Sequence, residues 1–331
     1  MSLPAEWEDQ EFVQLVFPHE KTDWIDYLDE AIETFVVIAK IISKYQKCLI
    51  VAKDLNYIQS LFTNKKNLIF TQINSDDTWS RDCGGITCRD DNGLIILDFN
   101  FNAWGNKFDY KLDNQITKEL YDKGFFDSFR YRYIPFVLEG GAIESNGDGV
   151  ILTTSKCLLE KNRNPNLTKN EIENKLVEYL GVKKVLWLNS GYLEGDDTDS
   201  HIDTLARFIN HDTIVYQSCD DKNDVHYSEL QKMKKELSSF TQIDGKKFKL
   251  IALPWIEAKY DKNERLPATY ANFLIINGAV LVPTYNDKND EKALLIFKKL
   301  FPSRDIIKID CQTLIRQHGS LHCVTMQYPK V

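Results

Sequence analysis

The residues from Gly195 to Asp203 place four carboxylates and one imidazole within nine positions. They read Gly-Asp-Asp-Thr-Asp-Ser-His-Ile-Asp, and apolar runs flank them on both sides. His201 and Asp203 are two positions apart, so on an extended segment both side chains would point to one face. A histidine and an aspartate at the entrance to a buried strand form a candidate acid/base and cation-binding pair. A solvated acidic loop without a function is the alternative interpretation.

Cys323 is a second candidate for chemistry, in the sequence Gly319-Ser-Leu-His-Cys. A thiol has an unperturbed pKa of about 8.5, so a nearby histidine or a cationic substrate must favour the thiolate before it can attack. His201 is the histidine expected to carry the proton. His322 is expected to point away from this site, because adjacent residues of a strand face opposite sides. A buried structural thiol is the alternative for Cys323.

Two more carboxylates stand close to pairs of glycines, Asp82 before Gly84-Gly85 and Glu139 before Gly140-Gly141. An ion-paired turn and an edge-strand carboxylate are the structural alternatives. Neither these acids nor the histidines of the chain form an HExxH motif or a histidine cluster of the kind that binds a metal. Several carboxylates beside a thiolate instead suit a planar cation such as a guanidinium, which carboxylates bind with paired hydrogen bonds.

The composition favours a soluble globular protein: 43% of the 331 residues are hydrophobic and 27% are charged. A formal net charge of −8 disfavours a nucleic-acid-binding surface. No apolar run approaches the roughly 18 residues of a membrane span, and the N-terminus does not resemble a signal peptide. A cytoplasmic location is therefore expected. The seven scattered cysteines indicate free thiols in a reducing compartment, at positions 48, 83, 88, 157, 219, 311 and 323.

Short strands alternate with helices along the chain, which predicts one α/β domain over residues 1–331. Thr168 and Glu171 form a capping-box pattern at the start of one helix, and Gly181 ends it. Helices are expected at 22–44, 55–62, 117–123, 169–180, 228–237 and 292–300. Strands are expected at 48–52, 67–71, 94–101, 131–138, 150–154, 205–210, 213–217, 247–253, 272–277, 279–283, 306–309 and 322–327.

The candidate residues fall at nearly regular intervals. Asp82 and Glu139 are 57 positions apart, Glu139 and His201 are 62 apart, and His201 and Cys323 are 122 apart, about twice 61. This spacing predicts five helix-plus-hairpin units that each point a strand end at one central site. The fourth unit is expected near residues 265–272.

These residues, together with further motifs along the chain, resemble the agmatine deiminase family, within the wider Porphyromonas-type peptidylarginine deiminase group. The resemblance runs nearly from end to end. Its motifs are Pro4-Ala-Glu-Trp7, Phe17-Pro-His19, Thr22-Asp-Trp24, Asp77-Thr-Trp-Ser-Arg-Asp82, Leu138-Glu-Gly-Gly141, Leu152-Thr-Thr154, Asn162-Arg-Asn-Pro165, Gly195–Asp203, Leu266-Pro-Ala-Thr-Tyr-Ala-Asn-Phe273, Asn277-Gly-Ala279 and His322-Cys323.

The resemblance implies a five-bladed β/α-propeller, the pentein fold, and hydrolysis of a guanidine to a urea and ammonia without a cofactor or metal. It implies that Cys323 attacks the guanidinium carbon, that His201 is the general acid/base, and that Glu139 orients His201. Asp82 and Asp203 would bind the guanidinium nitrogens. Trp79, Asp197 and Gly140 are further expected substrate contacts.

The far end of the substrate is less well defined, because two loops depart from the family pattern. These loops are Arg81-Asp-Cys-Gly-Gly85 and Gln317-His-Gly-Ser-Leu-His-Cys323. Agmatine is the expected substrate, since Trp79 and the acids Glu194, Asp196 and Asp197 suit its second cation. Peptidylarginine and free arginine are alternatives, because Arg81, Arg207 or Arg265 could bind a carboxylate.

The expected partner is therefore a small cationic guanidine, with no nucleic acid and no membrane, and a homo-oligomer is left open. A non-catalytic or metal-dependent protein, in which the acidic loop binds a divalent cation, is the alternative from another class.

Overall fold

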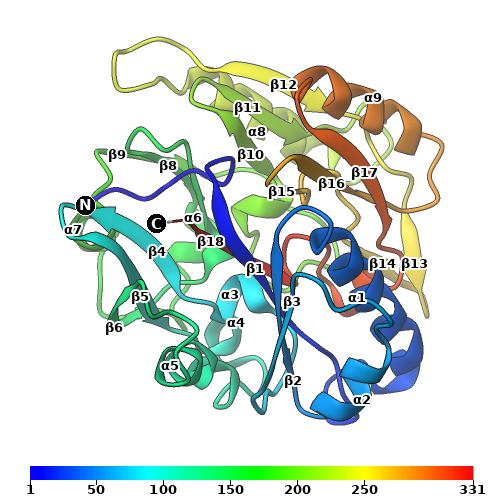
Figure 1. Ribbon diagram of the computed structural model, residues 1–331. Helices are drawn as coiled ribbons and strands as arrows, with labels where there is room; N and C mark the ends of the chain where they lie inside the picture. The colour runs from blue at the N-terminus through cyan, green and yellow to red at the C-terminus, as the bar shows by residue number, and fades with distance from the viewer. Residues whose placement is uncertain (331) are drawn as a thin grey trace.

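Strands and helices alternate throughout the computed structural model, which describes residues 1–330 (Figure 1). This confirms the α/β prediction. Five sheets repeat one pairing pattern, in which the first strand is antiparallel to the second and the second is parallel to the third. A sixth sheet is the small hairpin of β13 (Lys259–Asp261) and β14 (Glu264–Leu266).

Four of the five sheets have three strands in sequence order. They consist of β4 (Ile86–Asp90), β5 (Gly93–Asn100) and β6 (Arg130–Val137); β7 (Ile143–Ser145), β8 (Val150–Thr154) and β9 (Lys184–Leu188); β10 (Ala206–Asn210), β11 (Thr213–Gln217) and β12 (Lys249–Leu253); and β15 (Leu274–Ile276), β16 (Ala279–Thr284) and β17 (Asp305–Asp310). Each parallel crossover contains a helix, as parallel neighbours require: α5 (Ile116–Asp122), α7 (Lys169–Leu180), α8 (Tyr227–Ser239) and α9 (Asp290–Leu300).

The fifth sheet joins the two ends of the chain. Its order is β18 (Thr325–Pro329), β1 (Gln10–Val16), β2 (Lys47–Ala52) and β3 (Leu68–Gln72), with α1 (Leu28–Ile42) and α2 (Leu55–Ser60) in the crossovers. Strands from near the two ends of the chain accordingly lie side by side, with Gln10 opposite Pro329 (Figure 1). β1 is not among the strands predicted from the sequence, because the buried residues Gln10 and Gln14 interrupt its apolar pattern. The Gln10 side chain donates to the carbonyls of Glu6 and Ile275, which satisfies it inside the protein.

Local signals located the helices well. In α7 the Thr168 side chain accepts a hydrogen bond from the backbone N–H of Glu171, and the Glu171 carboxylate accepts one from the backbone of Thr168. Gly181 ends this helix with a φ of 67°, a left-handed conformation that favours glycine. Both features confirm the predicted capping box and C-cap.

Two predictions of extended backbone were wrong. The last strand starts at Thr325, so His322 and Cys323 lie in the preceding turn and do not alternate across a sheet. Asp203 lies in a short 3₁₀-helix, Ile202–Thr204, for which His201 is the N-cap residue. The argument that placed His201 and Asp203 on one face of a strand therefore fails, and their convergence depends on tertiary packing.

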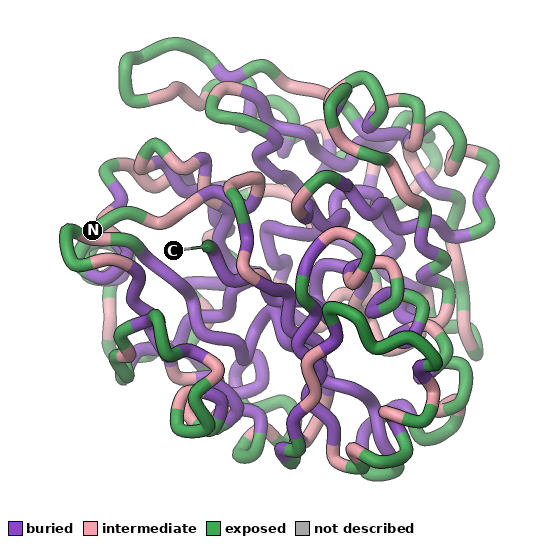
Figure 2. Tube along the Cα trace, viewed as in Figure 1, coloured by how far each residue is buried: buried purple, intermediate pink, exposed green. Residues whose placement is uncertain are grey.

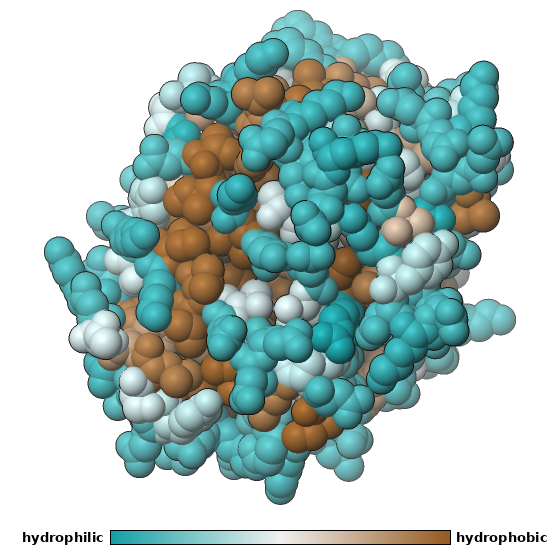
Figure 3. Space-filling view, turned by 90° about the vertical axis from the view of Figure 1, so that its right-hand side faces the viewer, coloured by the Kyte–Doolittle hydropathy of each residue, from teal (hydrophilic) through white to brown (hydrophobic). Residues whose placement is uncertain are grey.

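Buried chain segments fill the interior of the molecule, whereas exposed segments lie mainly at loops and on the outer helices (Figure 2). All seven cysteines are buried and unpaired, as the sequence analysis expected. On the face drawn in Figure 3, hydrophilic side chains predominate and an apolar band runs between them. Over the described part of the chain, no helix is both long enough and apolar enough to span a bilayer.

Candidate active site

The five repeated sheets bring one polar side chain each to a common site. Asp82, Glu139, His201, Asn272 and Cys323 all lie within a few residues before the first strand of their respective sheets. The regular spacing in the sequence thus corresponds to a repeated position in the topology. Asn272 occupies the position of the fourth unit, which the spacing placed near residues 265–272. Asn272 itself is nevertheless not among the site residues predicted from the sequence.

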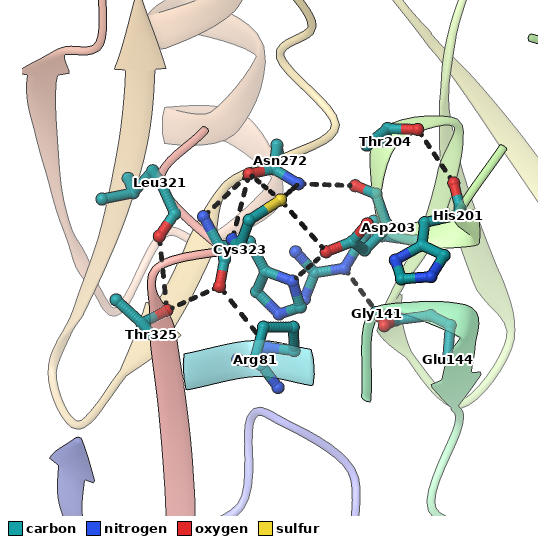
Figure 4. A network of polar contacts seen from close by, with 12 residues as sticks. Arg81, Gly141, Glu144, His201, Asp203, Thr204, Asn272, Leu321, Cys323 and Thr325 are labelled. Atoms are coloured by element: carbon teal, nitrogen blue, oxygen red, sulfur yellow. Dashed lines mark hydrogen bonds and ion pairs between the residues drawn. The ribbon is translucent and has the colours of Figure 1, made fainter. Parts of the chain in front are cut away.

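The Cys323 thiol is 5% exposed and contacts two polar side chains (Figure 4). Its Sγ lies 3.3 Å from Asn272 Nδ2 and 3.9 Å from Asp203 Oδ2. Burial, followed by the charges of Asp203 and Asp82, raises the pKa of Cys323 well above its usual value. The thiol is therefore protonated while no cation occupies the site.

Gly141 lies where three of the predicted residues converge. A Cβ atom at this position would lie 2.6 Å from His201 Nδ1, 2.8 Å from Asp82 Oδ1 and 3.2 Å from Asp203 Oδ2. Only glycine allows this approach. The backbone N–H of Gly141 also donates to Asp82 Oδ1 at 3.0 Å, and Trp104 Nε1 donates to Asp82 Oδ2 at 3.0 Å. The Asp82 carboxylate is thereby fixed in orientation, although its burial raises its pKa.

His201 is buried beside acidic groups, and neither ring nitrogen has a hydrogen-bond partner among the described residues. Its Nδ1 lies 3.6 Å from Asp82 Oδ1. Burial alone would lower the pKa of His201. The charge of Asp82, together with Cys157 and Glu139, outweighs burial and raises this pKa well above its usual value. The imidazole is thus positively charged near neutral pH and can donate a proton.

Glu139 is fully buried, and its two carboxylate oxygens have different surroundings. Oε1 accepts a hydrogen bond from Arg163 Nε at 2.7 Å, whereas Oε2 has no partner among residues 1–330. One oxygen of Glu139, Cys157 Sγ and a ring nitrogen of His201 lie within 4.8 Å of one another. Glu139 therefore lies close to His201, and Arg163 holds it in place; that Glu139 orients His201 stays a prediction.

Asp203 has the opposite electrostatic environment from Asp82. Burial would raise its pKa, but hydrogen bonding and charge from His322 lower it below the usual value. His322 Nδ1 lies 2.7 Å from Asp203 Oδ2. The prediction that His322 points away from the site is wrong, because the turn before β18 lets His322 and Cys323 both face Asp203.

A cavity of about 180 Å³ leads to Cys323 and contains several of the predicted contacts. Trp79, Asp82, Asp197 and Cys323 line it, and the Trp79 ring packs so closely on Gly319 that a Cβ there would lie 2.1 Å from the ring. The remaining lining residues are Asp23, Asp77, Trp104, Phe108, Thr198, Gln317, His318 and Gly319.

Two carboxylates of this cavity wall titrate near neutral pH. Asp77 accepts hydrogen bonds from Trp24 Nε1 at 2.9 Å and Trp79 Nε1 at 2.8 Å, yet burial raises its pKa to about 7. Burial also raises the pKa of Asp197 to about 6. Asp77 belongs to a motif quoted in the sequence analysis, but only the structure places it in the cavity.

Several other predicted contacts lie elsewhere. Gly140 lines a second cavity of about 70 Å³, where a Cβ would lie 2.2 Å from the Arg81 carbonyl oxygen. The Glu194 carboxylate faces Arg265 at 3.6 Å, and Asp196 accepts hydrogen bonds from Thr198 and Ser200 of its own loop.

The three arginines considered as carboxylate receptors are engaged with acids of the protein. Arg81 faces Glu6 at 3.8 Å, Arg207 binds Glu6 at 2.7 Å and Glu144 at 3.0 Å, and Arg265 binds Asp224 at 2.6 Å. Neither an arginine nor a lysine is among the described residues that line the Cys323 cavity.

The acidic loop lacks the geometry of a divalent cation site. Asp199 pairs with Arg163 at 2.7 Å and Lys107 at 2.9 Å, and Asp196 is bonded within its loop. Within residues 1–330, one group has metal-ligand spacing, namely Glu139, Cys157 and His201. Arg163 already neutralises Glu139 there, so these residues fit an acid/base pair better than a cation site.

We expect Mg²⁺ and Ca²⁺ to leave the stability of the protein unchanged, because Asp196 and Asp199 of the loop already have hydrogen-bonding or cationic partners. Thermal unfolding measured after chelation, with and without millimolar Mg²⁺ or Ca²⁺, should give midpoints within about 1 °C of each other. A cation-dependent rise of several degrees that Asp196→Asn abolishes would instead support a metal site in the loop.

Comparison with known proteins agrees with this geometry. The family model for Porphyromonas-type peptidyl-arginine deiminase matches residues 2–329. The agmatine deiminase of Pseudomonas aeruginosa (strain LESB58) is 31% identical, over 99% of this chain and 95% of its own. A cysteine-to-serine variant of the C. jejuni agmatine deiminase, solved with substrate bound, is 44% identical with a TM-score of 0.93, over 99% of this chain and 96% of that one.

A Porphyromonas gingivalis structure provisionally named an arginine deiminase is 49% identical, with a TM-score of 0.96, over 99% of this chain and 98% of that one. The matched residues of the family model extend over almost the whole sequence. The chain therefore belongs to the Porphyromonas-type peptidyl-arginine deiminase family.

Proposed function

We propose that this protein is a hydrolase that converts agmatine to N-carbamoylputrescine and ammonia. The observation that carries the proposal is the cavity in front of Cys323. Its inner end holds the thiol and Asp82, its outer wall carries Asp23, Asp77 and Asp197, and no arginine or lysine is found among the described lining residues. Agmatine has a guanidinium at one end and an ammonium at the other, which suits a cavity with carboxylates at both ends. The names of the P. aeruginosa and C. jejuni relatives support this assignment.

The first step of the proposed reaction is attack by Cys323. A guanidinium bound between Asp82 and Asp203 brings positive charge to the thiol, which lowers its pKa and releases its proton to water. The thiolate then attacks the guanidinium carbon and a C–S bond forms. Asn272 Nδ2, 3.3 Å from Sγ, holds the sulfur in position.

His201 carries protons in the later steps. Its imidazolium donates a proton to the leaving nitrogen, the C–N bond breaks, and ammonia departs from a thiouronium on Cys323. The neutral imidazole then removes a proton from water, whose oxygen attacks the same carbon. Breaking the C–S bond restores the thiolate, and the remaining proton on the new oxygen passes to solvent as the neutral urea product is released. Glu139, held by Arg163, stabilises the charged form of His201 throughout.

Selection of agmatine over arginine follows from the outer wall of the cavity. Arginine carries an α-carboxylate at the end where agmatine has none, and Asp77 and Asp197 would repel it. Burying a polar group without a hydrogen-bond partner costs about 2–7 kcal/mol, and burying an unpaired carboxylate costs more. Free arginine and peptidylarginine remain alternative substrates of the same machinery, and the name of the P. gingivalis relative makes them the necessary comparison.

The five repeated sheets support a pentein-type arrangement, in which each sheet is one blade of a propeller around the site. We propose that residues 1–331 form a single catalytic domain of this kind, located in the cytoplasm and working without a cofactor. The shared sheet of β18 and β1 supports this view, because it joins the two ends of the chain in one blade.

An ammonia-release assay with three substrates tests the assignment. We expect kcat/KM for agmatine to be at least about a hundredfold above that for free arginine, since the α-carboxylate is left unpaired. A blocked arginine peptide should give no measurable citrulline. Comparable rates with arginine or the peptide would be consistent with the same mechanism but would contradict agmatine as the preferred substrate.

Replacing the nucleophile should stop the reaction without unfolding the protein. Cys323→Ser is expected to abolish ammonia release, because a serine hydroxyl is barely ionised at neutral pH, and to leave the unfolding temperature nearly unchanged. Cys219→Ser, which alters another buried thiol, is the matched control and should retain activity. Mass spectrometry of the unaltered enzyme quenched during turnover should detect a covalent adduct on Cys323. Ammonia release near the normal rate from Cys323→Ser would contradict the mechanism.

The pKa of Asp77 predicts how agmatine affinity varies with pH. Burial raises this pKa to about 7, so the carboxyl is neutral at lower pH and becomes charged as pH rises through 7. We therefore expect KM for agmatine to fall as pH increases from 6 to 8. Butylguanidine, which lacks the ammonium group, should not show this change, and Asp77→Asn should remove it for agmatine. An identical pH dependence of KM for both substrates would show that Asp77 does not bind the ammonium group of agmatine.

A further inference from the structure

A buried chain of hydrogen bonds connects the active site to the N-terminal segment. His322 Nδ1 lies 2.7 Å from Asp203 Oδ2, and His322 Nε2 lies 2.7 Å from Glu6 Oε2. Asp203 and His322 are at most 1% exposed and Glu6 is 8% exposed. Glu6 belongs to the motif Pro4-Ala-Glu-Trp7, to which the reaction described above assigns no role.

The hydrogen bonds define the charge of His322. A neutral imidazole has one N–H and one acceptor nitrogen, so one nitrogen would direct a lone pair at a carboxylate oxygen. Because both nitrogens lie at hydrogen-bonding distance from carboxylates, both must donate, and the ring is an imidazolium between two anions.

The other charges around His322 are consistent with an imidazolium. Arg207 Nη2 lies 2.7 Å from Glu6 Oε2, and Arg207 Nε lies 3.0 Å from Glu144 Oε1. Arg81 Nη2 lies 3.8 Å from Glu6 Oε2. With a charged His322, the group contains three carboxylates (Glu6, Glu144 and Asp203) and three cations, so the buried charges balance. The neutral thiol of Cys323 adjoins this group.

The pairing leaves one oxygen of Asp203 for a ligand. Asp203 Oδ2 is held by His322, whereas Oδ1 is buried and has no hydrogen-bond partner among the described residues. Figure 4 shows this carboxylate between the Cys323 sulfur and the His201 ring. A guanidinium N–H can therefore complete the coordination of Asp203 without displacing an existing partner.

We propose that Glu6 and His322 are positioning residues that keep the Asp203 carboxylate ionised and turned toward the guanidinium of the substrate. Neither residue is among the described residues that line the Cys323 cavity; Glu6 contacts His322, His322 contacts Asp203, and Asp203 Oδ2 lies 3.9 Å from Cys323 Sγ, so both act through Asp203. Glu6 anchors the imidazolium, since its Oε1 is itself fixed by the backbone N–H of Ile275 at 2.7 Å. The inference rests on the proposed function for its kinetic consequence, whereas the charge of His322 can be measured without any substrate.

Nitrogen NMR of histidine-labelled protein tests the charge directly. At pH 7 the unaltered protein should show two protonated ring nitrogens for His322 in addition to those of the His201 imidazolium, and His322→Gln should remove one of these two signals from the spectrum of six histidines. Glu6→Gln, which preserves the side-chain shape, should shift the same ring toward its neutral form. A neutral His322 ring in the unaltered protein would overturn the inference whatever the substrate.

The pH dependence of kcat/KM for agmatine tests the consequence for Asp203. Without the imidazolium, Asp203 should take up a proton at higher pH. The loss of kcat/KM in His322→Gln should thus be at least about tenfold larger at pH 6 than at pH 8.5, one pKa unit being a factor of ten. Glu6→Gln should change the profile in the same direction. It also provides the test if His322→Gln fails to fold.

Glu144→Gln is the matched control, because it removes a buried carboxylate from the same group without touching His322 or Asp203. Any loss of kcat/KM in Glu144→Gln should therefore be equal at pH 6 and at pH 8.5. A loss that is equal at all pH values in His322→Gln and Glu6→Gln would mean a purely structural role and would overturn the proposal. Lack of agmatine hydrolysis by the unaltered protein would overturn the proposed function, with the NMR result still deciding the charge of His322.

Discussion

Charged side chains buried at the centre of the protein require partners, and their pairing organises the site. Glu139 is paired with Arg163, Glu6 with Arg207, and Asp203 with His322. An isolated buried charge is far more costly than a paired one. The polar atoms left without a partner within the described chain are therefore informative. Both nitrogens of His201, Glu139 Oε2 and Asp203 Oδ1 are such atoms, and all belong to residues around the proposed substrate position.

The repeated sheet pattern explains how residues far apart in sequence reach this centre. Each of the five sheets begins just after one of the polar residues, so the same structural position delivers a polar side chain five times. Convergence at such short distances also requires a position without a side chain. Gly141 provides it, since a methyl group there would overlap His201 and Asp82.

The two ends of the cavity have different electrostatic properties. Next to Cys323, hydrogen bonding and charge from His322 lower the pKa of Asp203, while the charge of Asp82 raises that of His201. Farther along the cavity, burial raises the pKa of Asp77 to about 7 and that of Asp197 to about 6, and the charges of Asp23 and Asp196 contribute to these increases. Asp203 and His201 are thus fully charged near neutral pH, whereas Asp77 and Asp197 are only partly ionised there.

The sequence alone determined the α/β class, most helices and strands, and the family, because helix caps, apolar periodicity and ordered motifs are local signals. It also predicted Cys323, His201, Glu139, Asp82 and Asp203 as one constellation, from their chemical types, the regular spacing of all but Asp203, and the family resemblance. Only the tertiary structure decided how they meet. His201 and Asp203 lie at a 3₁₀ turn and not on a strand, and His322 faces the site because the last strand starts three residues later than predicted.

The roles of Asn272 and Glu6 depend on contacts between distant segments, 51 residues apart for Asn272 and Cys323 and 316 apart for Glu6 and His322. Asp77 likewise becomes a cavity residue only when its loop packs near Cys323. Local sequence patterns specify backbone conformation and apolar faces. Hydrogen bonds between buried polar groups arise from the arrangement of whole sheets, which is why the charge state and orientation of the site residues could be read only from the folded chain.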